Sequence, residues 1–597
     1  MKKHIITITL LWAFAQSAMS AVVTPERAAG YAAGIMGMSS APVAEVSVQQ
    51  RVAGRNGAQA PEYYVFNNPK GGWVIIAADD RVSPVLAYSE TGSFNVDDMP
   101  TNVSWWMDDV AKYIDLAREL DVDATDEVLR AWGTLETLGD IPVNGKKVLK
   151  TALWDQGTPF NDLCPIATGD NTRSYTGCVA TAMSIIARYH SWPEKGKGVI
   201  GGYTADPYNS YIAPYSIDNH VYEWEKMPLN TTDDNVDSWT SEQKFQVAQL
   251  IHDCGVMVRM GYSADGSGAY SNEVAYELKE HMSYAESTTY VERSAYTSDE
   301  WFDIIRNEID ADRVVYYAGQ GNVGGHAFVC DGYEATDLSN KIRINWGWGG
   351  SFNGFYTLDL RIELSSSNYE EFGSSQKAII GIVPDTVSIS EPEIRAIVQY
   401  PYRDYFGLTR SSYFTDLSQG KRIRFVLGYF ANLSDNEISQ DYVVCLMDSS
   451  GTIRQQGWAA TIDFPAQNGY VYNGITDSTA LEVTPALTDY FQLFAKEGDD
   501  LVAVKPNYDW FPDGKGIICG VTVDPVIILP ETYSVGDVIP LKLSNGFAPL
   551  KSVQWKVDGE DYVEDKIVLK SGTTELSADL EFFDDTESTV SVIITVE

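Results

Sequence analysis

The residue pattern changes at residues 384–385, and this change constrains the fold more than any other feature of the chain. Before it, apolar residues at helical spacing alternate with short apolar runs. After it, short apolar-rich runs such as 422–427, 442–447 and 523–529 are separated by Asn, Asp, Gly and Ser. Strands at that spacing without helical periods are typical of β-sandwich modules. We therefore expect an α+β part followed by an all-β part.

Length and local pattern divide the chain further. At about 150 residues per domain, 597 residues correspond to roughly four domains. Residues 63–68 and 72–78 read as two strands across a short turn, and residues 103–120 have apolar residues at helical spacing. The predicted parts are a signal peptide at 1–20, a small α+β unit at 21–148, a mixed helix and strand domain at 149–385, and two β-sandwich modules of the Ig-like type at 391–522 and 523–597.

The first part has the pattern of a secretory signal peptide. Lys2 and Lys3 precede an apolar run at 5–14, and Ala18-Met19-Ser20 follows as a small-x-small cleavage signal. A membrane-spanning helix needs about 20 apolar residues, so this run is too short, and no later run is apolar enough. We expect cleavage after Ser20 and an exported protein that is extracellular, surface-associated or periplasmic.

Charge and cysteine content exclude several classes of function. Lys and Arg total 43 against 83 Asp and Glu, a net charge of −40. That charge repels phosphate backbones and anionic lipid, so nucleic acid is not an expected partner. The 6 cysteines include no C-x-x-C pair, and the 6 histidines show no metal-ligand spacing. We expect neither a disulfide scaffold nor a metal or other cofactor.

Cys178 begins a clear helical segment of the middle domain. Apolar residues at 179, 182, 183, 186 and 187 fall on one helical face, which places Cys178 at the amino end of a helix, directly after Gly177. Unpaired N–H groups and the helix dipole at that end stabilise a thiolate and can donate to an oxyanion beside the sulfur. A free cysteine is more commonly a buried structural residue. The position after glycine at a helix start favours a nucleophile.

A thiolate nucleophile needs a base, which is normally histidine. His326 stands at the head of an alternating strand, after two glycines that remove side-chain bulk beside it. The runs at 314–317 and 341–345 read as the strands before and after it. Asn345 on the following strand could hold the imidazole, and Trp346 could shield that contact from water. The alternative is a core histidine beside a packed tryptophan cluster.

Gln156 precedes the cysteine by a short stretch, in the sequence Trp154-Asp155-Gln156-Gly157. A glutamine amide can supply a second oxyanion donor, and the following glycine allows close approach. The alternative is a polar loop residue.

These stretches resemble the streptopain family of cysteine peptidases, a papain-like group that includes the interpains. The resemblance implies a Cys178–His326 catalytic pair, oxyanion donors from Gln156 and the Cys178 N–H, and Trp346 and Trp348 near the site. In papain-like enzymes an Asn orients the His, whereas tryptophan can substitute in streptopain-like ones, so the role of Asn345 stays open. The matching segments follow the family's order at 156–157, 176–182, 188–190, 315–317, 323–329 and 345–350.

Residues 21–148 resemble that family's inhibitory pro-segment, chiefly through the two predicted strands and the Asp79-Asp80 that follows them. The resemblance implies a zymogen whose pro-domain covers or distorts the site until it is cut. The polar, turn-forming segment at 140–150 reads as a loop, and we expect the cut at 146–150, although an ordinary linker has the same composition. The freed enzyme would hold a thiolate–imidazolium pair and hydrolyse peptide bonds of protein substrates.

Two other classes of function compete with a peptidase. One is a surface adhesin or binding protein that uses its β-modules, with an inert or secondary centre. The other is a different thiol acyl transfer on the same layout, such as transglutaminase or amidase chemistry. A set of Cys178, His326, Gln156 and Asn345 is more than packing requires, which favours an enzyme. The sequence does not indicate an oligomeric state.

Overall fold

We describe the fold from a computed structural model. The structure describes residues 22–38, 61–119, 124–136, 143–166, 172–205, 210–218, 220–230, 235–321, 324–336, 339–357, 376–389, 397–400, 419–420, 422–423, 426–432, 437–464, 470–475, 477, 479–486, 489–498, 500–505, 526–530, 533–543, 550–564, 566–582 and 587–596. The predicted signal peptide at 1–20 lies outside these residues. The chain forms two compact units, one of 1–289, 302–362 and 375–391, and one of 290–301, 363–374 and 392–597.

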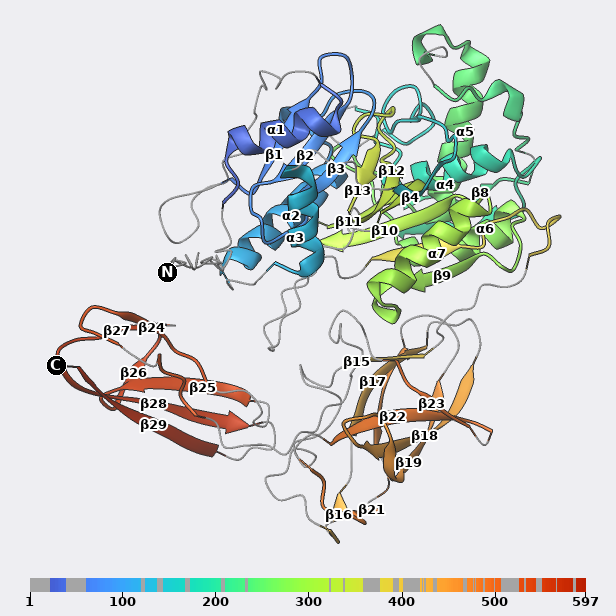
Figure 1. The fold of residues 1–597 in the computed structure, drawn as a ribbon. Helices are drawn as coiled ribbons and strands as arrows, with labels where there is room; N and C mark the ends of the chain where they lie inside the picture. Colours follow the sequence, from blue (N-terminus) through green and yellow to red (C-terminus); the bar gives the residue numbers. More distant parts are fainter. Residues whose placement is uncertain are drawn as a thin grey trace, which may run out of the picture. The chain divides into compact units, whose positions relative to one another are not determined.

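The first unit begins with a small α+β domain, as predicted (Figure 1). Its first helix has Pro25 at the first helical position, and the Thr24 hydroxyl accepts the Arg27 N–H at 3.3 Å. Behind its strands, the buried Asp79 carboxylate is paired with Arg118 at 2.8 Å and Arg81 at 3.1 Å. The elements are α1 (Pro25–Ile35), β1 (Tyr63–Asn67), β2 (Trp73–Ala77), β3 (Val85–Ser89), α2 (Thr101–Glu119) and α3 (Asp126–Glu136).

The strands of this domain extend the sheet of the middle domain. The sheet runs in the order β1-β2-β3-β13-β12-β11-β10-β14, and β4 pairs with β11 off this path. Across the junction, β3 and β13 are antiparallel, with Tyr88 opposite Phe355 and Ala87 opposite Tyr356. The domain is therefore joined to the middle domain by backbone pairing as well as by side chains.

The middle domain mixes helices and strands in the predicted order (Figure 1). The strands expected at 314–317, 323–329 and 341–345 are β10, β11 and β12. The elements are β4 (Val143–Val148), α4 (Cys178–His190), β5 (Val199–Ile200), β6 (Tyr203–Ala205), β7 (Ser210–Ile212), β8 (Tyr215–Ser216), α5 (Ser241–Met257), α6 (Val274–Met282), β9 (Thr289–Glu292), α7 (Ser298–Asp310), β10 (Val315–Gly321), β11 (Gly324–Thr336), β12 (Asn340–Asn345), β13 (Gly354–Tyr356) and β14 (Lys377–Ile380).

The central helix α4 is buried on every side, not on one face as its apolar spacing predicts. Its residues from Val179 to Ala187 are all buried, because β10 and β11 lie on one side and α5 on another. Small and hydroxyl side chains fill the remaining positions, where Thr181 and Ser184 donate to carbonyls of their own segment. The helix ends at Ser191, which has the left-handed φ of 50°.

The segment from Val143 to Val148 is the strand β4, so the prediction of a loop is wrong there. It is antiparallel to β11, with Gly332 opposite Val148 and Glu334 opposite Lys146. Lys146 extends to Glu90 at 2.7 Å and Glu334 at 3.5 Å. Polar composition suggested a turn, whereas pairing with a distant strand decides the conformation.

From residue 397 onward the second unit is built of strands, and none of its described residues there is helical. One buried cluster contains Trp458, Phe430 and Phe491, and another contains Ile539, Ile567 and Ile594. The boundary predicted at 522–523 lies outside the described residues. The strands are β15 (Ile397–Tyr400), β16 (Arg422–Ile423), β17 (Val426–Asn432), β18 (Ile438–Met447), β19 (Ile453–Phe464), β20 (Tyr470–Ile475), β21 (Thr479–Ala480), β22 (Tyr490–Glu497), β23 (Asp500–Ala503), β24 (Val538–Pro540), β25 (Leu550–Val557), β26 (Glu560–Tyr562), β27 (Lys566–Val568), β28 (Gly572–Phe582) and β29 (Glu587–Val596).

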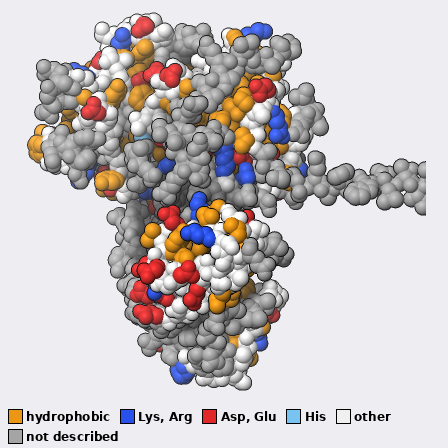
Figure 2. All heavy atoms as spheres, turned by 90° about the vertical axis from the view of Figure 1, so that its left-hand side faces the viewer, with side chains coloured by type: hydrophobic (Ala, Val, Ile, Leu, Met, Phe, Trp, Pro, Cys, Tyr) orange, Lys and Arg blue, Asp and Glu red, His pale blue; other side chains and the backbone are white. Residues whose placement is uncertain are grey.

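The fold class is thus the predicted one, an α+β part followed by an all-β part. The predicted strands at 442–447 and 589–596 lie within β18 and β29, whereas the described end of 523–529 holds only an isolated bridge at Ile527. Asp and Glu side chains gather on the face of the second unit that Figure 2 shows, in keeping with the net charge of −40. Among the described residues, no helix is both long enough and apolar enough to cross a membrane.

Candidate active site

Cys178 is the first residue of α4, as predicted, and it follows a glycine that the geometry requires. Gly177 has a φ of 86°, and a Cβ there would lie 2.6 Å from the Met260 sulfur. The Cys178 sulfur is half-buried and accepts the Ala327 N–H at 3.4 Å. Burial raises the pKa of this thiol, and hydrogen bonds from the N–H groups of Ala327, Val179 and Cys178 lower the pKa by a smaller amount.

His326 lies on β11 directly before Ala327, whose N–H donates to the Cys178 sulfur at 3.4 Å, while no hydrogen bond joins the imidazole to that sulfur among the described residues. Gly319 of β10 is the cross-strand partner of His326. The imidazole Nε2 is buried and has no hydrogen-bond partner among the described residues. Burial lowers the pKa of His326 to about 4. Burial thus favours the uncharged form of each group, the thiol of Cys178 and the neutral imidazole of His326.

A tryptophan from the N-terminal domain covers this histidine. Trp105 of α2 is buried, and its ring centroid lies 6.1 Å from that of His326. It also rests on Gly319, where a Cβ would lie 2.5 Å from the Trp105 Cη2 atom. The burial that keeps the imidazole neutral therefore includes a side chain from outside the middle domain.

Asn102, on the same helix, is hydrogen-bonded to the segment at 346–349, here called the tryptophan loop. Its Nδ2 donates to the Trp346 carbonyl at 3.1 Å, and its Oδ1 accepts the Trp348 Nε1–H at 2.9 Å. Asn102 is buried, and its bond to the Trp346 carbonyl is shielded from water, whereas the bond from Trp348 is only partly buried. Neither Asn102 nor Trp105 was predicted as a site residue, because apolar spacing identified their helix without showing which surface it covers.

Gln156 lies next to the segment that leads into the nucleophile. Its carbonyl accepts the Thr176 N–H at 3.1 Å, two residues before Cys178. The Gln156 side chain is buried, and its amide makes no hydrogen bond with the described residues. Its place is compatible with the predicted oxyanion role, which stays a prediction.

Asn345 does not orient the imidazole in this structure, and that expectation needs correction. Its Nδ2 donates to the Thr151 hydroxyl at 3.0 Å and to the Ala152 carbonyl at 2.9 Å, while its Oδ1 accepts the Gly347 N–H at 3.2 Å. The residue is fully buried and fixes the start of the tryptophan loop. It is opposite Val329 on β11, three positions beyond His326.

The two predicted tryptophans have different surroundings. Trp346 is buried against Phe328, at a centroid distance of 4.8 Å, and against Tyr356, at 5.2 Å. Trp348 lies nearer the surface and makes an edge contact with Tyr175 at 6.2 Å. Trp346 thus packs beneath the site, whereas Trp348 borders it.

The glycine-rich segment at 261–270 is hydrogen-bonded to Tyr175, three residues before Cys178. The Ser263 carbonyl accepts the Tyr175 N–H at 3.1 Å, and the Ser267 hydroxyl donates to the Tyr175 carbonyl at 2.7 Å. The segment therefore borders the approach to Cys178.

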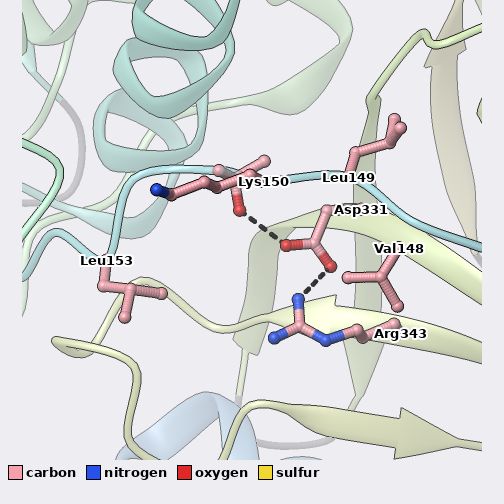
Figure 3. Close-up of a pocket in the computed structure, with 7 residues that line it drawn as sticks. Val148, Leu149, Lys150, Leu153, Asp331 and Arg343 are labelled. Atoms are coloured by element: carbon pink, nitrogen blue, oxygen red, sulfur yellow. Dashed lines mark hydrogen bonds and ion pairs between the residues drawn. The ribbon is translucent and has the colours of Figure 1, made fainter. Parts of the chain in front are cut away.

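A cavity of about 250 Å³ lies elsewhere in the middle domain. Figure 3 shows the Arg343 guanidinium directed at Asp331, at 2.5 Å, and the Thr151 hydroxyl also donates to that buried carboxylate at 2.6 Å. Asp331 is thus paired with Arg343 and Thr151, and no predicted catalytic residue lines the cavity. The lining residues are Val148, Leu149, Lys150, Thr151, Leu153, Asp331 and Arg343.

A cysteine at a helix amino end, with a histidine on an adjoining strand and a buried glutamine nearby, is the layout of a papain-like thiol hydrolase. Comparison with known proteins gives the family. The model described as Peptidase C10 family matches residues 154–356, and the model described as Spi protease inhibitor matches residues 20–114. Streptopain of Streptococcus pyogenes is 30% identical over 383 residues, which cover 61% of this chain and 90% of streptopain. The chain belongs to the peptidase C10 family of cysteine peptidases and carries an inhibitor-like pro-domain.

Other relatives cover the chain differently. The thiol protease/hemagglutinin PrtT of Porphyromonas gingivalis is 33% identical over 353 residues, which span 58% of this chain and 39% of PrtT. A mutant fragment of prointerpain A from Prevotella intermedia is 28% identical over 55% of this chain and 97% of the fragment, with a TM-score of 0.44. The predicted class of enzyme and the resemblance to this family are confirmed.

Proposed function

We propose that the chain is a cysteine endopeptidase that is made as a self-inhibited zymogen, exported, and active on protein substrates. The observation that supports this most is the place of Cys178, at the amino end of α4 and 3.4 Å from the amide that follows His326. Family membership supports peptide-bond hydrolysis over an adhesin with an inert centre. The activity is assigned to Cys178 as nucleophile and His326 as base, with Gln156 as an oxyanion donor.

The chemistry follows from these roles once the pro-domain has left. His326 takes the thiol proton, and the thiolate attacks the carbonyl carbon of the scissile peptide. The carbonyl electron pair becomes an oxyanion, which the Gln156 amide and the Cys178 N–H stabilise. The imidazolium protonates the leaving amine as the C–N bond breaks, and a thioester remains. The imidazole then takes a proton from water as the water oxygen attacks the thioester carbon. The C–S bond breaks, the carboxylic acid product leaves, and the imidazolium returns its proton to the sulfur.

The pro-domain inhibits by contact and by desolvation. Trp105 covers His326, and Asn102 holds the Trp346–Trp348 turn through two hydrogen bonds. Substrate would have to occupy the same surface. A neutral thiol is also a poor nucleophile, so burial suppresses reactivity as well as access.

We place the first cut before Val143 and not at 146–150. Every residue of β4 is within a strand, and its register with β11 occupies the backbone groups that a peptidase reads in an extended substrate. Lys147 adds an ion pair with Asp312 at 2.8 Å. The strand would then stay with the mature enzyme as part of its sheet.

Export is proposed from the sequence at 1–20, which has the charge, apolar run and cleavage signal of a secretory leader. The final location, extracellular or surface-associated, belongs to the same proposal. The second unit is proposed as a separate part that does not supply catalytic groups.

The direct test is maturation of the full-length chain with and without its nucleophile. We expect the purified precursor to shorten over time to a product whose first residue lies before Val143, and Cys178→Ala to stay full length. Cys254→Ala is the matched control, because that thiol is fully buried. Normal maturation of Cys178→Ala without added protease would refute self-processing.

A further inference from the structure

Asp155, which directly precedes Gln156, folds its side chain back onto the backbone. Its Oδ1 accepts the Gln156 N–H at 2.6 Å and the Gly157 N–H at 2.9 Å. A short acidic side chain that binds the next N–H groups fixes a tight turn without help from a helix or strand. The backbone that carries the Gln156 side chain is therefore set by Asp155.

This turn connects two other segments of the site. The Gln156 carbonyl accepts the Thr176 N–H at 3.1 Å, on the approach to Cys178. The Trp154 carbonyl accepts the Gly349 N–H at 2.9 Å, in the tryptophan loop. Gly349 lies against the same carboxylate, since a Cβ there would be 3.3 Å from the Asp155 Oδ2 atom. Three loops thus meet at Asp155.

The hydrogen bonds of this turn determine which groups remain for an oxyanion. The N–H groups of Gln156 and Gly157 are occupied by the Asp155 carboxylate. Gln156 is 5% exposed as a whole residue, and its side-chain amide makes no hydrogen bond with the described residues. It is therefore the group of this turn that is free to donate. A carboxylate close to a developing oxyanion would oppose it unless backbone N–H groups already bind that carboxylate.

We propose that Asp155 is a positioning residue for the reaction, acting through Gln156 by holding its amide in the direction of the oxyanion. This inference rests on the proposed function. Asp155 itself does not contact substrate. Its contribution depends on the acceptor oxygen and not on the charge, so asparagine should replace it.

The test compares steady-state hydrolysis of a peptide by mature Asp155→Ala, Asp155→Asn, Gln156→Ala and the double variant Asp155→Ala/Gln156→Ala. Loss of one oxyanion donor lowers kcat by about 10²–10³. We expect that loss for Gln156→Ala, about 10–100-fold for Asp155→Ala, and recovery to within about threefold in Asp155→Asn. The double variant should be no slower than Gln156→Ala, and KM should change little.

A second readout separates positioning from a general structural role. Alkylation of Cys178 by iodoacetamide is a direct displacement that forms no oxyanion, so its rate should be the same in all four variants. If Asp155→Ala does not fold, Asp155→Glu carries the test, because its longer side chain cannot close the same turn and kcat should fall likewise.

Three results would overturn the inference: a double variant that is slower by the product of both losses, failure of asparagine to restore kcat, or alkylation that falls in parallel with hydrolysis. If Gln156→Ala keeps full kcat, the oxyanion role in the proposed function is wrong instead. The two failures are thereby distinguishable.

Discussion

The contact between Trp105 and Gly319 allows the most specific test of inhibition by the pro-domain. Gly319 lies opposite His326 on the neighbouring strand, and a Cβ added there would lie 2.5 Å from Trp105 Cη2 and 3.0 Å from Cζ2. Both distances are far inside van der Waals contact, and an indole held in a buried site has little freedom to move. Gly319→Ala should therefore push the pro-domain helix away from the site.

The expected size follows from the cost of overpacking. One extra methyl group in a well-packed contact costs about 1–3 kcal/mol. Under the proposed maturation the mature enzyme lacks Trp105, so this cost falls on the inhibited state alone. The fraction of precursor with an open site should rise by about 5–150-fold, at 1.4 kcal/mol per factor of ten.

The assay is the initial rate of hydrolysis of a fluorogenic peptide by freshly purified precursor, divided by the rate after complete maturation of the same variant. This ratio cancels any effect of the substitution on catalysis itself. Gly325→Ala is the matched control: it also lies beside His326, but its Cβ would meet its nearest atom, the Gly319 carbonyl oxygen, at 3.7 Å. An unchanged ratio in Gly319→Ala, or an equal rise in both variants, would refute the reasoning.

Two further predictions concern the same contact surface. Burial lowers the pKa of His326 to about 4 and raises the pKa of Cys178 in the precursor. Iodoacetamide should therefore alkylate Cys178 of the precursor slowly throughout the ordinary thiol range and faster only at pH above that range. The mature enzyme should react rapidly already at about pH 6, and identical pH profiles would contradict this. Asn102→Ala removes one buried and one partly buried hydrogen bond, together worth about 1–3 kcal/mol, so the precursor should mature about 5–150-fold faster, as measured by electrophoresis. The control is Thr101→Ala, a substitution at the exposed neighbouring residue. Equal maturation rates in the two variants would show that the Asn102 hydrogen bonds do not restrain the pro-domain.

Local periodicity was enough to predict several elements of the first unit. The strands at 63–67 and 73–77 and the helix from Cys178 follow from apolar spacing and turn residues, and the helix predicted at 103–120 is α2, which begins two residues earlier. Such signals depend on neighbours in the chain, so a single sequence contains them. The order of β10, β11 and β12 followed in the same way.

The remaining features depend on contacts between distant residues. Val143 to Val148 is polar in composition but becomes a strand because β11 offers it a partner. Asn345 has the residue type expected of a histidine partner, yet Thr151 and Ala152 take its donors. Asn102 and Trp105 contact residues that are far from them in the sequence. Asn102 and Trp346, for example, are hydrogen-bonded although 244 positions separate them in the chain. Asp155 was detectable, because an acidic residue before Gln-Gly is a turn signature.

The central claim is that Cys178 becomes reactive beside His326 only after the pro-domain has left. The most direct measurement is stoichiometric labelling by a covalent, peptide-based cysteine-protease inhibitor, with the labelled residue identified by mass spectrometry. We expect one label per mature molecule, located on Cys178, with almost none on the precursor or on mature His326→Ala. Equal labelling of precursor and mature enzyme, or a label on another cysteine, would contradict the account.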